Sequence, residues 1–177
     1  MKKLIIILFS VVTLVSCKNK PSLQKYFVEN AESKDFIAID LGSDIINTEK
    51  MALTEADKET LKSFEKMNIL AFRNDKANES NYDVEVKKVK TILKDTISYS
   101  ELMKFGSGND GASIYVVGDD EHINEFVLFA NRKENGFAVV RILGKDMNPM
   151  NIMNIISLMQ KSDINLEQLK PLQEIMK

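Results

Sequence analysis

The chain has one cysteine, one histidine and no tryptophan among its 177 residues. A single cysteine excludes a disulfide bond within the chain, so the fold must be stabilised by packing. A single histidine leaves little to activate a hydroxyl nucleophile, and no serine stands in a Gly-x-Ser-x-Gly pattern. We therefore do not expect an enzyme, although a pair of carboxylates that act together is defined only by distance in space and stays open.

An excess of positive charge is also missing. The chain has 24 basic and 26 acidic residues and a formal net charge of −2. Nucleic-acid binding needs lysine and arginine to replace counterions along the phosphates, so we predict no nucleic-acid partner. The same balance does not favour adhesion to an anionic membrane surface. Lys87, Lys88, Lys90 and Lys94 do share a predicted helix, but such a face is usually only solvated, and binding of something anionic is the alternative.

The amino-terminal stretch has the parts of an export signal. Lys2 and Lys3 precede the apolar run 4–15, and the small residue Ser16 follows it. The run is too short to cross a hydrocarbon core of about 30 Å, so we interpret it as the apolar part of a cleavable leader over residues 1–16. Export from the cytoplasm is implied.

Leu14-Val15-Ser16-Cys17 resembles the bacterial lipobox. The resemblance implies that the Cys17 sulfur is joined to diacylglycerol and that the new amino terminus receives a fatty acyl chain such as palmitate. The alternative is an ordinary secretory signal with a coincidental cysteine. In the lipobox interpretation, residues 17–22 are the lipidated cysteine and a tether of at most about 18 Å. No aspartate follows Cys17, which by resemblance to known sorting rules favours the periplasmic side of the outer membrane.

Three apolar runs separated by polar turns dominate the second half of the chain. They cover residues 112–117, 123–130 and 137–143, and they predict a three-stranded antiparallel meander. In the middle run Phe126 and Leu128 point to one face while Val127 and Phe129 point to the other. Both faces of this sheet therefore need cover, from helices of this chain or from a partner or ligand.

The remainder predicts helices that alternate with two further strands, over residues 36–41 and 67–72. The predicted helices begin at capping residues or at a proline that follows one: Ser22, Thr54, Ser80, Ser98 and Asn148. We predict a single α+β domain over residues 23–177. Its sheet of about five strands would be mixed, parallel where helices cross over and antiparallel in the meander. Pro171 interrupts the tail after Ser162, which reads as a weak helix or a frayed end.

Two short patterns could hold a ligand. Gly106–Gly111 matches Gly-x-Gly-x-x-Gly, but a predicted helix precedes it and a strand follows, the reverse of the order that binds pyrophosphate. We expect a flexible or helix-capping loop. Asp119–His122 collects three carboxylates and the histidine, yet adjacent side chains point in different directions and favour a solvated turn. We predict neither a cofactor nor a metal site.

Asp95-Thr96-Ile97 is similar to the short O-glycosylation site of Bacteroidetes envelope proteins. Glycosylation of Thr96 is one interpretation. The other is that Thr96 simply ends its helix.

The order of elements, the phrase Tyr99–Met103, the glycine loop before Ile114-Tyr115-Val116 and the meander ending at Gly144 resemble one known family. This is the domain-of-unknown-function 4252 family of small lipoproteins from Bacteroidetes-type bacteria. The resemblance implies an envelope lipoprotein of unassigned activity, and a weak link of some members to sigma-factor or anti-sigma genes suggests envelope sensing. It assigns no functional residue.

We therefore expect a non-catalytic module, anchored through Cys17, that binds another envelope protein by an apolar surface left uncovered. Met150, Met153 and Met159 would suit such a contact, although a methionine stripe at helical spacing is more often core. The alternative is a protein that binds a small apolar ligand between sheet and helices. A connected void behind the sheet would favour the ligand, and a closed core with an exposed apolar patch would favour the partner.

Overall fold

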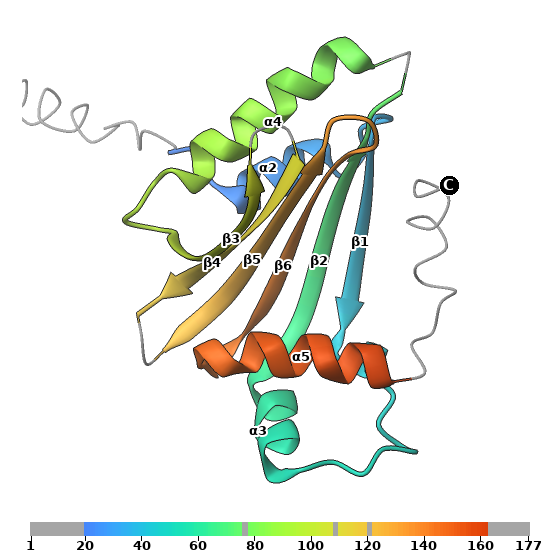
Figure 1. Cartoon of the computed structure of the whole chain (residues 1–177), viewed down its shortest axis with the longest axis vertical. Helices are drawn as coiled ribbons and strands as arrows, with labels where there is room; N and C mark the ends of the chain where they lie inside the picture. Colours follow the sequence, from blue (N-terminus) through green and yellow to red (C-terminus); the bar gives the residue numbers. More distant parts are fainter. Residues whose placement is uncertain (1–19, 76–77, 108–109, 120–121, 163–177) are drawn as a thin grey trace, which may run out of the picture.

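The computed structural model describes residues 20–75, 78–107, 110–119 and 122–162 of the chain. One sheet with helices on both faces forms an α+β domain, as the sequence predicts (Figure 1). The first half contains α2 (Leu23–Asn30), β1 (Phe36–Gly42), the 3₁₀ helix η1 (Ser43–Ile45), α3 (Glu55–Ser63) and β2 (Phe64–Arg73). The second half contains α4 (Glu79–Leu93), β3 (Ser100–Ser107), β4 (Asp110–Gly118), β5 (Ile123–Arg132), β6 (Gly136–Met147) and α5 (Pro149–Lys161).

The strands lie in the order β1-β2-β6-β5-β4-β3, and every neighbouring pair is antiparallel. The predicted meander is confirmed as β4, β5 and β6. The predicted parallel part is wrong. α3 returns the chain at one end of the sheet, so β2 pairs antiparallel with β1, and β6 later takes the place beside β2.

The sheet has six strands because a predicted helix is a strand. Ser98-Tyr99-Ser100-Glu101 has the spacing of a capping box, but β3 begins at Ser100 and pairs with β4. Tyr99 is buried, and its hydroxyl accepts a hydrogen bond from the Leu23 amide at 3.2 Å. Pairing along the edge of the sheet and burial of Tyr99 outweigh a capping pattern that reports only local preference.

The predicted helix starts at Ser22, Thr54 and Asn148 are confirmed. The predicted start at Ser80 is wrong, because α4 begins at Glu79 with Asn78 as its N-cap and Ser80 lies inside the helix. The Ser22 side chain caps α2, and Thr54 forms a reciprocal capping box with Asp57 at the start of α3. In α4, Tyr82, Val86, Val89 and Leu93 form one buried stripe. The predictions for the leader, for Cys17 and for the tail after Ser162 lie outside the described residues. Within the described part, no helix is long and apolar enough to cross a membrane.

α2 and α4 cover one face of the sheet, which we call the helix-pair face (Figure 1). Its core joins both helices to aromatic side chains of four strands: Phe36, Phe72, Phe129 and Phe137. The Phe72 and Phe137 rings stack with centroids 5.3 Å apart.

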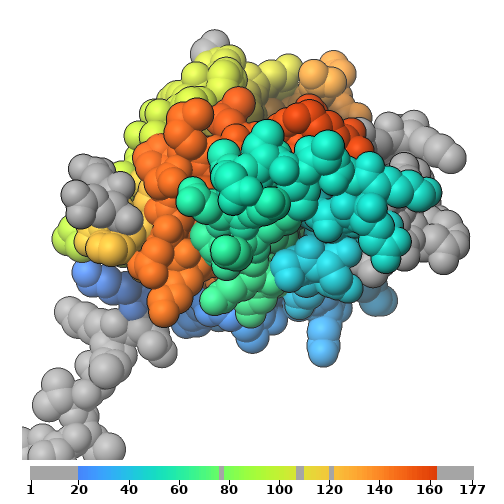
Figure 2. Space-filling model, turned by 90° about the horizontal axis from the view of Figure 1, so that it is seen from below, coloured from blue at the N-terminus to red at the C-terminus, as the bar shows by residue number. Residues whose placement is uncertain are grey.

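α5 crosses the opposite face, which we call the α5 face, and α3 closes the adjoining end of the molecule (Figures 1 and 2). Ile152, Ile155 and Leu158 of α5 are fully buried, whereas Ile156 and Met159 are half-buried. The buried Thr60 hydroxyl accepts a hydrogen bond from Asn151 at 2.9 Å and so fixes α5 against α3. Figure 1 shows that α5 spans only one half of this face.

A buried ion pair lies between the sheet and α2. Arg141 of β6 donates two hydrogen bonds to the Glu125 carboxylate of β5, at 2.6 Å and 2.9 Å, and a third to the Gln24 side chain. Both charged residues are more than nine-tenths buried, and the guanidinium lies over the Phe27 ring at 5.4 Å. Such a pair is weak evidence for net stability, but removing one partner leaves an uncompensated buried charge.

We expect Glu125→Ala to lower the free energy of unfolding by about 3–5 kcal/mol, because Arg141 then stays charged and buried without its carboxylate. The double variant Glu125→Leu with Arg141→Met should regain most of that loss, since no charge remains. Urea unfolding of the three proteins measures both values. A single variant as stable as the parent would contradict the role of the pair.

Candidate functional site

The half of the α5 face that α5 leaves bare carries a row of alanines. Ala71, Ala138, Ala130 and Ala112 lie next to one another in register on β2, β6, β5 and β4. The register continues to Ile37 on the edge strand β1 and to Phe105 on the edge strand β3. Because paired residues point to the same face, six side chains form one line across the whole sheet.

Differences in side-chain size make this line concave. The side chains that lie two positions closer to α5 on the same strands are larger and apolar: Ile69, Val140, Leu128 and Ile114. Phe105, with 56% of its side chain exposed, rises at the β3 edge. The result is an open groove of about 760 Å³ lined mainly by apolar atoms, which we call the sheet groove. Its volume is that of a ligand site, but one side is open to solvent.

The floor of the sheet groove is held from behind. The residues next to the alanines on the strands point to the helix-pair face, where Phe72 and Phe137 stack and Phe129 lies 6.1 Å from Phe137. Gly136, two residues before Ala138 on β6, has φ of +128°, and a Cβ there would lie 1.9 Å from the Phe72 carbonyl oxygen. Only glycine fits this close approach of β6 to β2.

The glycine pattern lies at the rim of the sheet groove. Gly106 and Gly111 line it from the β3–β4 hairpin, in which Ser107 pairs with Asp110. Gly106 has φ of +69°, and a Cβ there would lie 2.6 Å from the Asp110 carbonyl oxygen. The predicted loop after a helix is therefore a turn between two strands. The next described element is the strand β4, whereas phosphate binding would need a helix amino terminus there.

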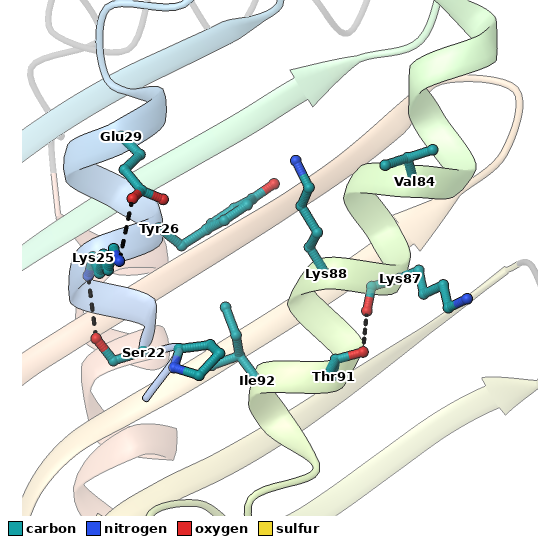
Figure 3. A pocket seen from close by; sticks show the side chains of 10 residues that line it. Ser22, Lys25, Tyr26, Glu29, Val84, Lys87, Lys88, Thr91 and Ile92 are labelled. Carbon is teal, nitrogen blue, oxygen red and sulfur yellow. Dashed lines mark hydrogen bonds and ion pairs between the residues drawn. The ribbon is translucent and has the colours of Figure 1, made fainter. Parts of the chain in front are cut away.

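A second, smaller groove lies between α2 and α4 on the outside of the helix-pair face (Figure 3). Its volume is about 430 Å³, and Pro21, Lys25, Val84, Lys87 and Thr91 are among the residues that line it. Three of the predicted lysines are exposed and one, Lys90, is half-buried with its ammonium 5.9 Å from the Phe129 ring centre.

Glu85 joins the two helices at this groove. The Tyr26 hydroxyl donates to one carboxylate oxygen at 2.8 Å, and the Lys88 ammonium donates to the other at 2.7 Å. Burial, and then the hydrogen bond to Glu85, raises the pKa of Tyr26 above its ordinary value. The hydroxyl therefore stays protonated as a donor, and the contact is structural rather than that of a proton-transfer group.

The histidine turn has a partner that the sequence did not reveal. His122 Nδ1 lies 3.0 Å from an Asp146 carboxylate oxygen, and the His122 amide donates to the Asp119 side chain at 2.8 Å. Both side chains of the His122–Asp146 pair are more than half exposed. Asp120 and Glu121 lie outside the described residues. Among the residues that are described, no three histidine, cysteine or acidic side chains are close enough to hold a metal ion.

Thr96 lies in an exposed turn after α4, which ends at Leu93. The neighbouring Asp95 side chain accepts hydrogen bonds from the Ile97 amide and the Ser98 hydroxyl, and these fix the turn. Its position is compatible with modification, and glycosylation of Thr96 stays a prediction.

Sequence reasoning missed the alanine row, although it placed three of the four alanines within the predicted meander strands. The signal is one alanine in each of four apolar runs. Only the register of the strands shows that these alanines are neighbours, and register depends on pairings that no single run contains.

A six-stranded antiparallel sheet with two helices on one face, and a groove on the half-covered other face, defines a small α+β domain with an exposed apolar surface. Residues 26–155 match the model of the domain of unknown function DUF4252, and the chain belongs to that family. No curated protein and no solved structure matches the chain significantly.

We expect His122→Ala to change the free energy of unfolding by less than about 1 kcal/mol, because an exposed ion pair contributes little. Thermal unfolding of this variant and of Asp146→Asn, which removes the charge at a residue with φ of +51° that asparagine tolerates, measures the effect. A large loss of stability in either variant would show that the pair holds the β6 end in place and is not a surface contact.

Proposed function

We propose that this protein is an exported lipoprotein, anchored through Cys17 to the periplasmic side of the outer membrane, whose sheet groove binds an apolar segment of another envelope protein. The leader and the lipobox-like sequence support the anchor. One structural observation carries the binding role: four alanines in register form the floor of an exposed apolar groove.

The shape of the groove favours a macromolecular partner over a small ligand. A small-molecule site typically buries most of its ligand, whereas the sheet groove is open along the bare half of the α5 face. The two cores on either side of the sheet are filled by packed side chains. An exposed apolar patch beside a closed core is the arrangement expected of an interaction module.

The residues that line the sheet groove indicate what kind of partner segment it would bind. Alanine side chains allow a helix or strand of the partner to approach the sheet closely, and Phe105 offers an aromatic contact at the edge. Arg132 and Asp110, paired in register at the open end, are both exposed and can meet polar groups that flank an apolar stripe. We propose an amphipathic segment as the occupant, bound by its apolar face.

A small apolar ligand is the second candidate, because the groove volume lies within the range of about 300–1,000 Å³ that such sites occupy. This ligand would lie on the sheet rather than between the sheet and the helices. The variant below tests both candidates, since it fills the space that either would need.

We expect Ala130→Phe to abolish partner binding while it leaves the fold intact, because Ala130 is exposed and a phenyl ring there would occupy the groove. A photo-crosslinking residue in place of Phe105, in the full chain in living cells, reports binding. One crosslinked envelope protein that disappears in Ala130→Phe supports the proposal.

Val28→Phe is the matched control, because Val28 is 68% exposed on α2, on the opposite side of the sheet. This control should keep the crosslink, and both variants should unfold within a few degrees of the parent. A crosslink unaffected by Ala130→Phe would contradict the groove as the binding site. A small molecule that copurifies with the parent and is absent from Ala130→Phe would favour the second candidate instead.

A further inference from the structure

The outer surface of α2 and α4 is basic at the end where the tether leaves the domain. Pro21 and Ser22, which lead into α2, lie against the carboxyl-terminal part of α4 (Figure 3). Lys87 and Lys88 line the groove there, and Lys94 follows on the same helical stripe as Lys87 and Thr91. We call Pro21, Lys25, Lys87, Lys88, Thr91 and Lys94 the tether-side face.

The acidic residues of these helices do not cancel this charge. Lys25 and Lys88 form ion pairs with Glu29 and Glu85, at 3.7 Å and 2.7 Å. Lys87 and Lys94 form no ion pair within the described part of the chain. Glu79 and Asp83 lie in the first half of α4, away from the tether. The tether-side face is therefore locally positive, although the whole chain has a net charge of −2.

We propose that the tether-side face lies against the anionic lipid bilayer to which the chain is anchored. This inference rests on the proposed lipidation of Cys17. Cys17 is four residues from Pro21, a reach of at most about 14 Å, so the bilayer surface is within reach of the face. Each lysine near an anionic membrane surface strengthens the association about fivefold.

The apolar parts of the same surface fit this contact. Val84 is 52% exposed on the groove between the helices, and the groove lining is mostly apolar. Lysine side chains bury their methylene stems against apolar groups while their ammonium groups meet phosphates. The headgroup region of a bilayer offers both environments at once.

This orientation has a consequence for the proposed binding site. The tether-side face and the sheet groove lie on opposite sides of the sheet. When the helices α2 and α4 rest on the bilayer, the sheet groove opens away from it and stays accessible to a partner.

The single cysteine makes a direct test practical. In the full-length lipoprotein Cys17 carries lipid, so a cysteine in place of exposed Thr91 can be labelled alone with a polarity-sensitive dye. Met153→Cys, on α5 of the opposite face, is the matched control. Both proteins are reconstituted in vesicles of phosphatidylethanolamine with phosphatidylglycerol and in vesicles of phosphatidylcholine alone.

We expect the Thr91 label to report an apolar environment in the anionic vesicles only, and the Met153 label to stay in water. Lys87→Gln with Lys94→Gln should lower the ratio of bilayer-bound to free orientation about fivefold for each lysine removed. Lys62→Gln with Lys66→Gln, at exposed positions near the end of α3, should leave it unchanged.

Acylated protein whose Thr91 label stays in water, or whose Met153 label enters the bilayer, would overturn the orientation alone. Protein without the acyl mass, and therefore not bound to vesicles, would overturn the anchor and the orientation together. The mass of the intact protein distinguishes these two results.

Discussion

The fold depends on one constraint: both faces of the central strands are apolar and must be removed from water. β5 and β6 carry large side chains toward α2 and α4 on one face and toward α5 on the other. α2 and α4 cover the helix-pair face, whereas α5 alone covers only half of the α5 face. Where α5 ends its cover, the side chains shrink to alanine, and this reduces the apolar surface left in contact with water. The groove therefore forms because small side chains keep the exposed apolar area low where no helix covers the sheet.

Polar and charged side chains also hold α2 and α4 on the sheet. The buried Arg141–Glu125 pair lies under α2, so that helix is joined to the sheet by hydrogen bonds as well as by apolar contact. Glu85 then joins α2 to α4 through Tyr26. These directional contacts fix how α2 lies on the domain, and hence which surface would face the membrane in the orientation that we propose.

Local patterns predicted the elements better than their assembly. The helix start at Thr54 and the three runs of the meander both follow from preferences that neighbouring residues set, and the structure agrees with them. Ser98–Glu101 shows the limit, because a valid capping pattern yields to strand pairing that no local signal contains. The alanine row and the His122–Asp146 pair were missed for the same reason, since each joins residues that are far apart in the sequence. Parallel crossovers were inferred from element order alone, which does not record at which end of the sheet a helix turns the chain.

The alanine row also determines how the groove could change. Its depth comes from side-chain size alone, on strands whose register and rear packing are set elsewhere. One enlarged residue would make the groove shallower at one strand, and a different combination would move the deepest point along the row without altering the backbone. A change of this kind needs one codon at a time, so the binding preference that we propose for the groove could change in small steps while the fold stays constant.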